Sequence, residues 1–187
     1  MFIEKNLLWN EQQIEASKDI LKKIKKLDLE SVRISFADQH GLLRGKTIMV
    51  SELETVFASG CSMTSTLLLK DTSNRTAFPI WSHGAGLNEN QLTGAGDMIM
   101  VPDPNSFQVL PWAYKTGWLL SDIYFPNGKP IPYSSRGLCR QALGRLADQG
   151  FDYFSGIEIE FHLFKISDAN LRFNASGMPG TPPEVSP

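Results

Sequence analysis

The segment Ser31–Val50, "SVRISFADQHGLLRGKTIMV", predicts two antiparallel strands joined by a tight turn. Val32, Ile34 and Phe36 alternate with polar residues, as expected of a strand with one buried face. The letters "DQHG" supply turn-forming residues, and "LLRGKTIMV" then returns with further apolar positions. We therefore expect a β-hairpin here, which provides the first two strands of a sheet.

Helices are predicted on both sides of this hairpin. Residues 11–26 repeat apolar residues at helical spacing, with acidic residues first and lysines last, as the helix dipole favours. A shorter helix is expected after the hairpin, with Ser51 as its N-cap and Gly60 at its end. A third helix is expected from Ser134 to Gln149, with an apolar stripe for burial that consists of Leu138, Ala142, Leu143 and Leu146. Helices around a sheet predict an α+β fold.

Three further short strands are predicted between the second and third helices. The stretches "DMIMVPD" from Asp97, "SFQVLPW" from Ser106 and "GWLLSDIYF" from Gly117 are apolar runs separated by turn-forming residues. Before them, residues 71–96 are polar and rich in glycine. A loop of this length in a compact domain is usually functional or disordered, and its aromatic residues argue against full disorder.

Residues 156–164, "GIEIEFHLF", also have the pattern of a strand. Apolar and polar residues alternate, so that two glutamates fall on one face: Ile157, Ile159, Phe161 and Leu163 alternate with Glu158, Glu160 and His162. On spacing alone, this polar face favours an exposed hairpin; the alternative is a pair of ligands for a hard divalent cation, Mg²⁺ or Mn²⁺. Because one strand cannot bury both of its faces, the chain is expected to be cut short before the partners of this strand.

Composition and charge exclude several functional classes. The 187 residues are 42% hydrophobic and carry a net charge of −2, so the chain can bury a core and has no strong electrostatic attraction to nucleic acid. No apolar run is long enough to span a bilayer, and the N-terminal residues do not resemble a signal peptide. Cys61 and Cys139 lie far apart in the sequence, which favours reduced, buried thiols in a cytoplasmic protein.

The order of four motifs resembles that of the glutamine synthetase family. Residues 32–48, "VRISFADQHGLLRGKTI", are similar to its early hairpin, F-x-D-x-x-G-x-x-R-G-K, and residues 94–112, "GAGDMIMVPDPNSFQVLPW", to its S/G-D-M-x-x-x-P-D segment. Residues 117–143 resemble the stretch that crosses into the catalytic domain, and "GIEIEFHLF" resembles the strand G-x-E-x-E-F-x-L-F. Each motif is modest alone, but four in the family's order, over about residues 31–164, are specific.

This resemblance implies a domain organisation and a reaction. An N-terminal helix in residues 1–27 would precede a β-grasp domain in residues 28–128, and residues 129–187 would contribute the first helix and strand of a truncated catalytic domain. The family joins glutamate to ammonia or another amine: ATP phosphorylates the γ-carboxylate, and the amine displaces phosphate from the γ-glutamyl phosphate. Full-length members form homo-oligomeric stacked rings, in which a β-grasp loop, here residues 71–96, covers the neighbouring subunit's site.

The resemblance also implies two metal ligands. Glu158 would bind the ion nearer the ATP phosphates, and Glu160 the ion nearer the glutamate, each ion being Mg²⁺ or Mn²⁺. The remaining family ligands and most nucleotide contacts would lie beyond Pro187, so the chain alone is expected to be inactive. His162 replaces an aromatic residue of the family and is expected to form hydrogen bonds near the glutamates rather than to bind metal.

The chain departs from the family pattern in the long loop. Family members often carry "FDGSS" there, and its aspartate helps to bind and deprotonate ammonium. The matching residues are "FPIWSHGAG" from Phe78, which put Pro79 near the aspartate position and leave Ser82 as the candidate for the last serine. Because proline cannot act as a base, the departure favours an amine bulkier than ammonia.

Two alternatives from other functional classes remain. A non-catalytic structural or binding protein of the same fold is supported by Pro79, whereas the paired glutamates argue against it. A free-standing interaction module is a second alternative, and the unpartnered strand at residues 156–164 argues against that.

Overall fold

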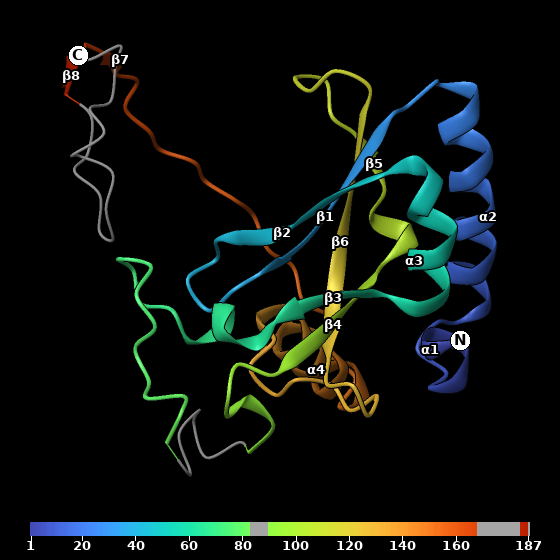
Figure 1. Cartoon of the computed structure of the whole chain (residues 1–187), viewed down its shortest axis with the longest axis horizontal. Helices are drawn as coiled ribbons and strands as arrows, with labels where there is room; N and C mark the ends of the chain where they lie inside the picture. Colours follow the sequence, from blue (N-terminus) through green and yellow to red (C-terminus); the bar gives the residue numbers. More distant parts are fainter. Residues whose placement is uncertain (83–89, 168–183, 187) are drawn as a thin grey trace.

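The computed structural model describes residues 1–82, 90–167 and 184–186, and shows a mixed α/β fold built on one sheet (Figure 1). Its strand order is β2-β1-β6-β4-β3, with β5 paired to β6 beside β4, and β7 and β8 form a separate two-stranded ribbon. The helices are α1 (Phe2–Lys5), α2 (Glu11–Lys26), α3 (Leu53–Ser59) and α4 (Ser135–Asp148). The strands are β1 (Ser31–Ala37), β2 (Leu43–Met49), β3 (Cys61–Thr64), β4 (Asp97–Pro102), β5 (Gln108–Val109), β6 (Thr116–Tyr124), β7 (Lys165–Ile166) and β8 (Val185–Ser186). Short 3-10 turns cover Val50–Glu52, Ser65–Leu69, Asn90–Leu92 and Pro104–Ser106.

The predicted hairpin is confirmed as β1 and β2. These strands pair antiparallel from Ser31 opposite Met49 to Ala37 opposite Leu43. Every second residue of β1 faces the core, and Val32, Ile34 and Phe36 are at most 2% exposed. The alternation in the sequence therefore fixed both the strand and its buried face.

Strand β6 occupies the middle of the sheet. It pairs parallel with β1 along Thr116–Leu120, and its other edge pairs antiparallel with β5 and then with β4. The three strands predicted between residues 97 and 125 are therefore confirmed as β4, β5 and β6.

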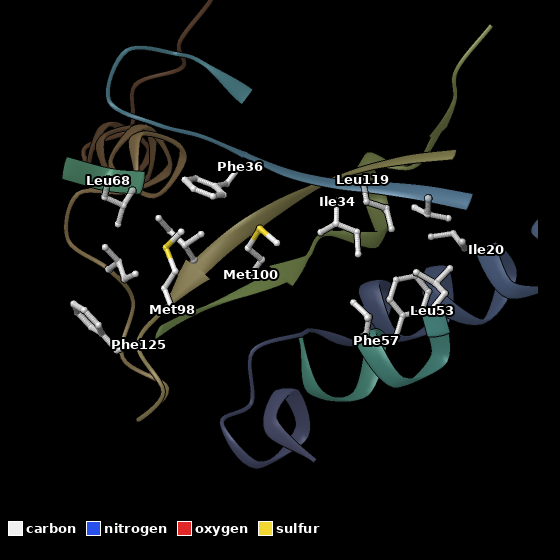
Figure 2. Packing of buried hydrophobic residues seen from close by; sticks show 14 of the residues in the cluster. Ile20, Ile34, Phe36, Leu53, Phe57, Leu68, Met98, Met100, Leu119 and Phe125 are labelled. Carbon is white, nitrogen blue, oxygen red and sulfur yellow. The ribbon is translucent and has the colours of Figure 1, made fainter. Parts of the chain in front are cut away.

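Helices α2 and α3 cover one face of the sheet and complete the core (Figure 2). Ile20 of α2, and Leu53 and Phe57 of α3, pack with Ile34 of β1 and Leu119 of β6. Burying one such side chain stabilises the fold by about 1.5–3 kcal/mol. The helix predicted at residues 11–26 has the bounds of α2.

Helix caps follow the sequence in part. Gly60 ends α3 with φ of +73°, a backbone conformation that L side chains rarely adopt. The predicted N-cap at Ser51 is wrong, because a 3-10 turn occupies Val50–Glu52 and α3 begins after Glu52 with no side-chain cap. Asn10 instead forms a capping box with Gln13 at the start of α2.

The apolar stripe predicted on α4 is not buried. Leu138, Leu143 and Leu146 are 50%, 40% and 38% exposed. The helix is attached to the sheet by charges instead, because Arg136 bonds to Asp103, and Arg140 bonds to Asp122 at 2.9 Å. Of the two serines at the start of α4, Ser134 is the N-cap, and its side-chain oxygen accepts a hydrogen bond from the backbone N–H of Gly137 at 3.1 Å.

The strand predicted at residues 156–164 is also absent. The chain leaves α4 as an exposed, unpaired segment and reaches β7 only at Lys165 (Figure 1). Ile157, Ile159, Phe161 and Leu163 are 76–88% exposed. A strand needs a neighbour for its backbone hydrogen bonds, and within the described residues this segment has none.

Two further sequence expectations concern thiols and membranes. Both cysteines are free, but only Cys61 is half-buried and Cys139 is exposed, so the prediction of two buried thiols is wrong. Burial raises the pKa of the Cys61 thiol. Among the described helices, none has the length and apolarity that crossing a bilayer requires.

Gly45→Ala tests the close approach of the hairpin strands. A Cβ at Gly45 would lie 1.8 Å from the backbone oxygen of Ile34, so the pairing has to shift. We expect a loss of about 3 kcal/mol in the free energy of unfolding, measured by urea denaturation. Gly144→Ala is the matched control, because Gly144 is helical with nothing within 4 Å, and it should gain about 0.5–1 kcal/mol. Equal stabilities of the two variants would contradict this account.

Candidate functional site

The paired glutamates lie on the unpaired segment after α4. Glu158 and Glu160 are both exposed, and the apolar residues between them are exposed too. His162 stacks on Phe164, with ring centroids 6.1 Å apart. Within the part of the chain that the structure describes, no other residues enclose the two glutamates.

The donor chemistry suits a hard divalent cation, but the number of donors does not. Carboxylate oxygens are the ligands that Mg²⁺ and Mn²⁺ prefer, and such ions need several of them in fixed geometry. Within residues 1–82, 90–167 and 184–186, no three histidine, cysteine, aspartate or glutamate side chains are grouped closely enough to hold a metal ion. Among the described residues, Glu158 and Glu160 have no third histidine, cysteine, aspartate or glutamate close enough to share a metal ion with them.

The third predicted residue, Ser82, lies at the end of the described part of the long loop. Its side chain is exposed, and its backbone N–H donates to the carbonyl oxygen of Pro79 at 2.8 Å. Ile80 lies between them and is 7% exposed, whereas the indole of Trp81 is 79% exposed. The turn thus presents Pro79, Trp81 and Ser82 around a buried anchor, while the predicted residues at 83–89 fall outside the described residues.

A pocket of about 560 Å³ opens beside the hairpin. Its size is typical of small-molecule sites, and its lining combines aromatic, cationic and hydroxyl groups, including Trp112, Trp118, Arg33 and Thr47. None of Ser82, Glu158 and Glu160 lines it, and its lining includes no carboxylate. The pocket therefore carries no acid–base pair and is separate from the predicted site residues.

The hairpin turn contains a buried carboxylate to which the sequence analysis assigned no role. The side chain of Asp38 is fully buried; one of its oxygens accepts hydrogen bonds from the backbone N–H groups of His40 and Leu42, at 2.9 and 3.0 Å. The other oxygen accepts from Nε of Arg44 at 2.6 Å. The sequence does contain a signal for this buried pair, namely an aspartate in a turn followed six residues later by an arginine. A buried charge requires such a partner.

These contacts decide the charge state of Asp38. Burial by itself would raise the pKa of this carboxyl, but the hydrogen bonds from Arg44 and from two backbone N–H groups outweigh burial and hold the pKa below its usual value. Since the folded state lowers the pKa, ionised Asp38 stabilises the fold above the unfolded pKa of about 4. That contribution is lost as the pH falls through the lower, folded pKa.

Comparison with known proteins adds the family. No protein-family model matches the chain. A γ-glutamylanilide synthase from Acinetobacter sp. is 39% identical over 187 residues, which covers 98% of this chain and 37% of that protein. A glutamine synthetase from Methanosarcina mazei is 30% identical over 158 residues, and a glutamate–isopropylamine ligase from Pseudomonas sp. is 26% identical over 167 residues. The chain spans about a third of the length of these relatives.

Solved structures share the fold. A GmaS–ADP complex superposes with a TM-score of 0.52 at 24% identity, and covers 69% of this chain and 25% of its own. A glutamine synthase homologue gives a TM-score of 0.52 at 24% identity, with 65% and 27% covered. The chain belongs to the glutamine synthetase family. Within that family it is similar to a protein that is named for forming γ-glutamylanilide.

Asp38→Asn tests the buried carboxylate. The variant removes the carboxylate charge that pairs with Arg44 and replaces one acceptor oxygen with an NH₂ group. We therefore expect the free energy of unfolding to fall by about 2–4 kcal/mol at pH 7. The unfolding free energy of the wild type should fall more steeply than that of the variant as the pH drops below about 4. Urea titrations at a series of pH values give both quantities, and parallel acid limbs would contradict the role of Asp38.

Manganese binding tests the paired glutamates. With two exposed carboxylates, we expect the 187-residue chain to bind Mn²⁺ no more tightly than about 1 mM. Electron paramagnetic resonance of free Mn²⁺ measures this, and the double variant Glu158→Gln, Glu160→Gln should give the same curve. Micromolar binding that the double variant abolishes would show that the chain forms a metal site by itself.

Proposed function

We propose that this chain is the N-terminal part of an ATP-dependent ligase that joins the γ-carboxylate of glutamate to an amine through γ-glutamyl phosphate. The observation that carries the proposal is the similarity to γ-glutamylanilide synthase along 98% of the chain. The motif "GIEIEFHLF" within this stretch also supports it, because two glutamates in this spacing resemble the family's metal-binding strand.

The proposed domain organisation follows the same resemblance. Residues 28–128 would be the β-grasp domain, and a mixed sheet with parallel β1 and β6 beside an edge hairpin is consistent with that. Residues 1–27 would be its N-terminal helical extension, and residues 129–187 the start of the catalytic domain. The exposed apolar residues of α4 and of residues 151–164 support this division, because such surface is costly to leave in water.

Glu158 and Glu160 would act as metal ligands only in a longer protein. There, Mg²⁺ or Mn²⁺ would screen the phosphates of the co-substrate ATP, and further ligands would have to complete the coordination. The role of the two glutamates would be to hold their carboxylates side by side, Glu158 toward the phosphates and Glu160 toward the glutamate substrate.

The amine is proposed to be bulkier than ammonia. Pro79 falls near the position at which family members carry an aspartate for ammonium, and the proline side chain offers neither a charge nor a proton acceptor. Trp81 adds an exposed apolar ring two residues later, next to Ser82. One relative is named for forming γ-glutamylanilide and another for joining glutamate to isopropylamine, which supports the same direction. Ammonia is the alternative acceptor.

We further propose that the active protein is a cytoplasmic homo-oligomer.

A non-catalytic protein of the same family is the second candidate. Pro79 favours it, because it removes a group on which ammonia-using members depend. A protein without catalysis, however, would have no chemical reason to keep Glu158 and Glu160 two residues apart, since like charges held close together repel each other.

An amine screen tests the proposed function. We expect the complete protein that contains this chain to release phosphate from ATP with glutamate and an aromatic or alkyl amine, with kcat/KM at least about tenfold above that for ammonia. The 187-residue chain alone should release none. Preference for ammonia would overturn the amine assignment, and an absence of release with every amine would favour the non-catalytic candidate.

A further inference from the structure

We propose that the β1–β2 turn is a clamp that positions the loop carrying Pro79, Trp81 and Ser82. The hairpin clamp consists of Asp38, Gln39, His40 and Arg44. It deepens the proposed function and rests on it in one respect, namely that this loop contacts the amine. The residues of the hairpin clamp are positioning residues, because they act through the loop.

Asp38 organises the clamp. Its buried carboxylate orders the turn through the N–H groups of His40 and Leu42, and the backbone of the turn closes where the N–H of Asp38 donates to the carbonyl oxygen of Leu42 at 3.0 Å. The same carboxylate orients the guanidinium of Arg44, whose side chain is only 14% exposed. Arg44 is therefore fixed at one nitrogen and has other nitrogens free to reach outward.

Three side chains of the clamp reach a segment about thirty residues further along the chain. Nη1 of Arg44 donates to the Oδ1 of Asn74 at 3.0 Å. Nε2 of His40 lies 2.9 Å from the carbonyl oxygen of Lys70, and Nε2 of Gln39 donates to the carbonyl oxygen of Leu68. Residues 68–74 are thus bonded to the hairpin turn at three separate points.

Hydrogen bonds within the loop hold residues 69–77 in a fixed arrangement, so fixing residues 68–74 also positions the residues that follow. Asp71 accepts hydrogen bonds at one carboxylate oxygen from the N–H groups of Ser73 and Arg75, both at 2.9 Å. The N–H of Ala77 donates to the carbonyl oxygen of Leu69 at 2.8 Å, which closes the loop at its base. Ile80 then enters the core three residues later. Its backbone leads directly into the exposed turn that ends at Ser82.

Two independent restraints therefore act on the exposed turn. Burial of Ile80 holds the exposed turn against the core. The bonds from the hairpin clamp fix the direction from which residues 68–77 approach the turn. Loss of Arg44 would break the ion pair with Asp38 and the hydrogen bond to Asn74 together, because one guanidinium bonds both residues.

Hydrogen–deuterium exchange of the 187-residue chain tests the clamp. In Arg44→Met we expect amides in residues 70–82 to exchange at least about tenfold faster, beyond any acceleration that α2 shows from a loss of global stability. Arg44→Lys should also loosen the loop, since an ammonium cannot bond Asp38 and Asn74 with a planar fork. Arg33→Met is the matched control: Arg33 is exposed on the same hairpin, and exchange in residues 70–82 should change less than about twofold.

Two exchange results with Arg44→Met alone would overturn the proposal. One is unchanged exchange of residues 70–82 in Arg44→Met. The other is an equal acceleration in α2, which would mean that Arg44 only stabilises the whole fold. Asn74→Ala combined with Arg44→Met closes a double-mutant cycle, and purely additive effects on exchange would also contradict a shared link.

Kinetics of the complete protein separate the clamp from the proposed function. In Arg44→Met, the KM for the amine should rise about fivefold while the KM for ATP stays within about twofold. A loosened loop with an unchanged amine KM would overturn the positioning role. If the wild type shows no turnover with any amine, the proposed function fails, and the exchange result still decides whether the hairpin clamp holds the loop.

Discussion

The parallel pairing of β1 with β6 is the constraint on which the rest of the structure depends. It joins Ser31–Ser35 to Thr116–Leu120 across some eighty residues of chain, so everything between them has to be arranged around one sheet. Its buried members, Val32, Ile34 and Leu119, form the floor on which α2 and α3 pack. This pairing forms only after a long loop has closed, and closing that loop costs conformational entropy. The buried apolar contacts of β1 and β6 have to offset that cost.

The hairpin that forms one half of this pairing also carries Asp38, the most deeply buried charged residue in the described part of the fold. Burying Asp38 requires that each carboxylate oxygen find a donor, and the turn supplies two backbone donors while Arg44 supplies the third. The same arginine then reaches Asn74. A local requirement of the turn thereby couples the rigid sheet to an exposed loop, the type of element that carries function on a fixed scaffold.

In the region after the sheet, tertiary contacts override what the local sequence pattern predicts. Helix α4 forms from its own sequence, with Ser134 as its cap, yet its leucines stay 38–50% exposed while Arg136 and Arg140 form ion pairs with Asp103 and Asp122. Residues 156–164 have a clear strand pattern and form no strand, because alternation specifies a face but cannot supply the neighbouring backbone. The paired glutamates are exposed for the same reason.

The sequence by itself determined the hairpin, the strands β4 and β6, the bounds of α2 and the family, because these depend on local periodicity, caps and a specific order of motifs. It also placed Glu158, Glu160 and Ser82 as candidates, through resemblance rather than geometry. Only the tertiary structure decided that β1 and β6 are parallel neighbours, that Asp38 is buried against Arg44, and that the turn bonds residues 68–74. Those contacts join residues distant in sequence, and one-dimensional periodicity contains no information about which distant segments meet.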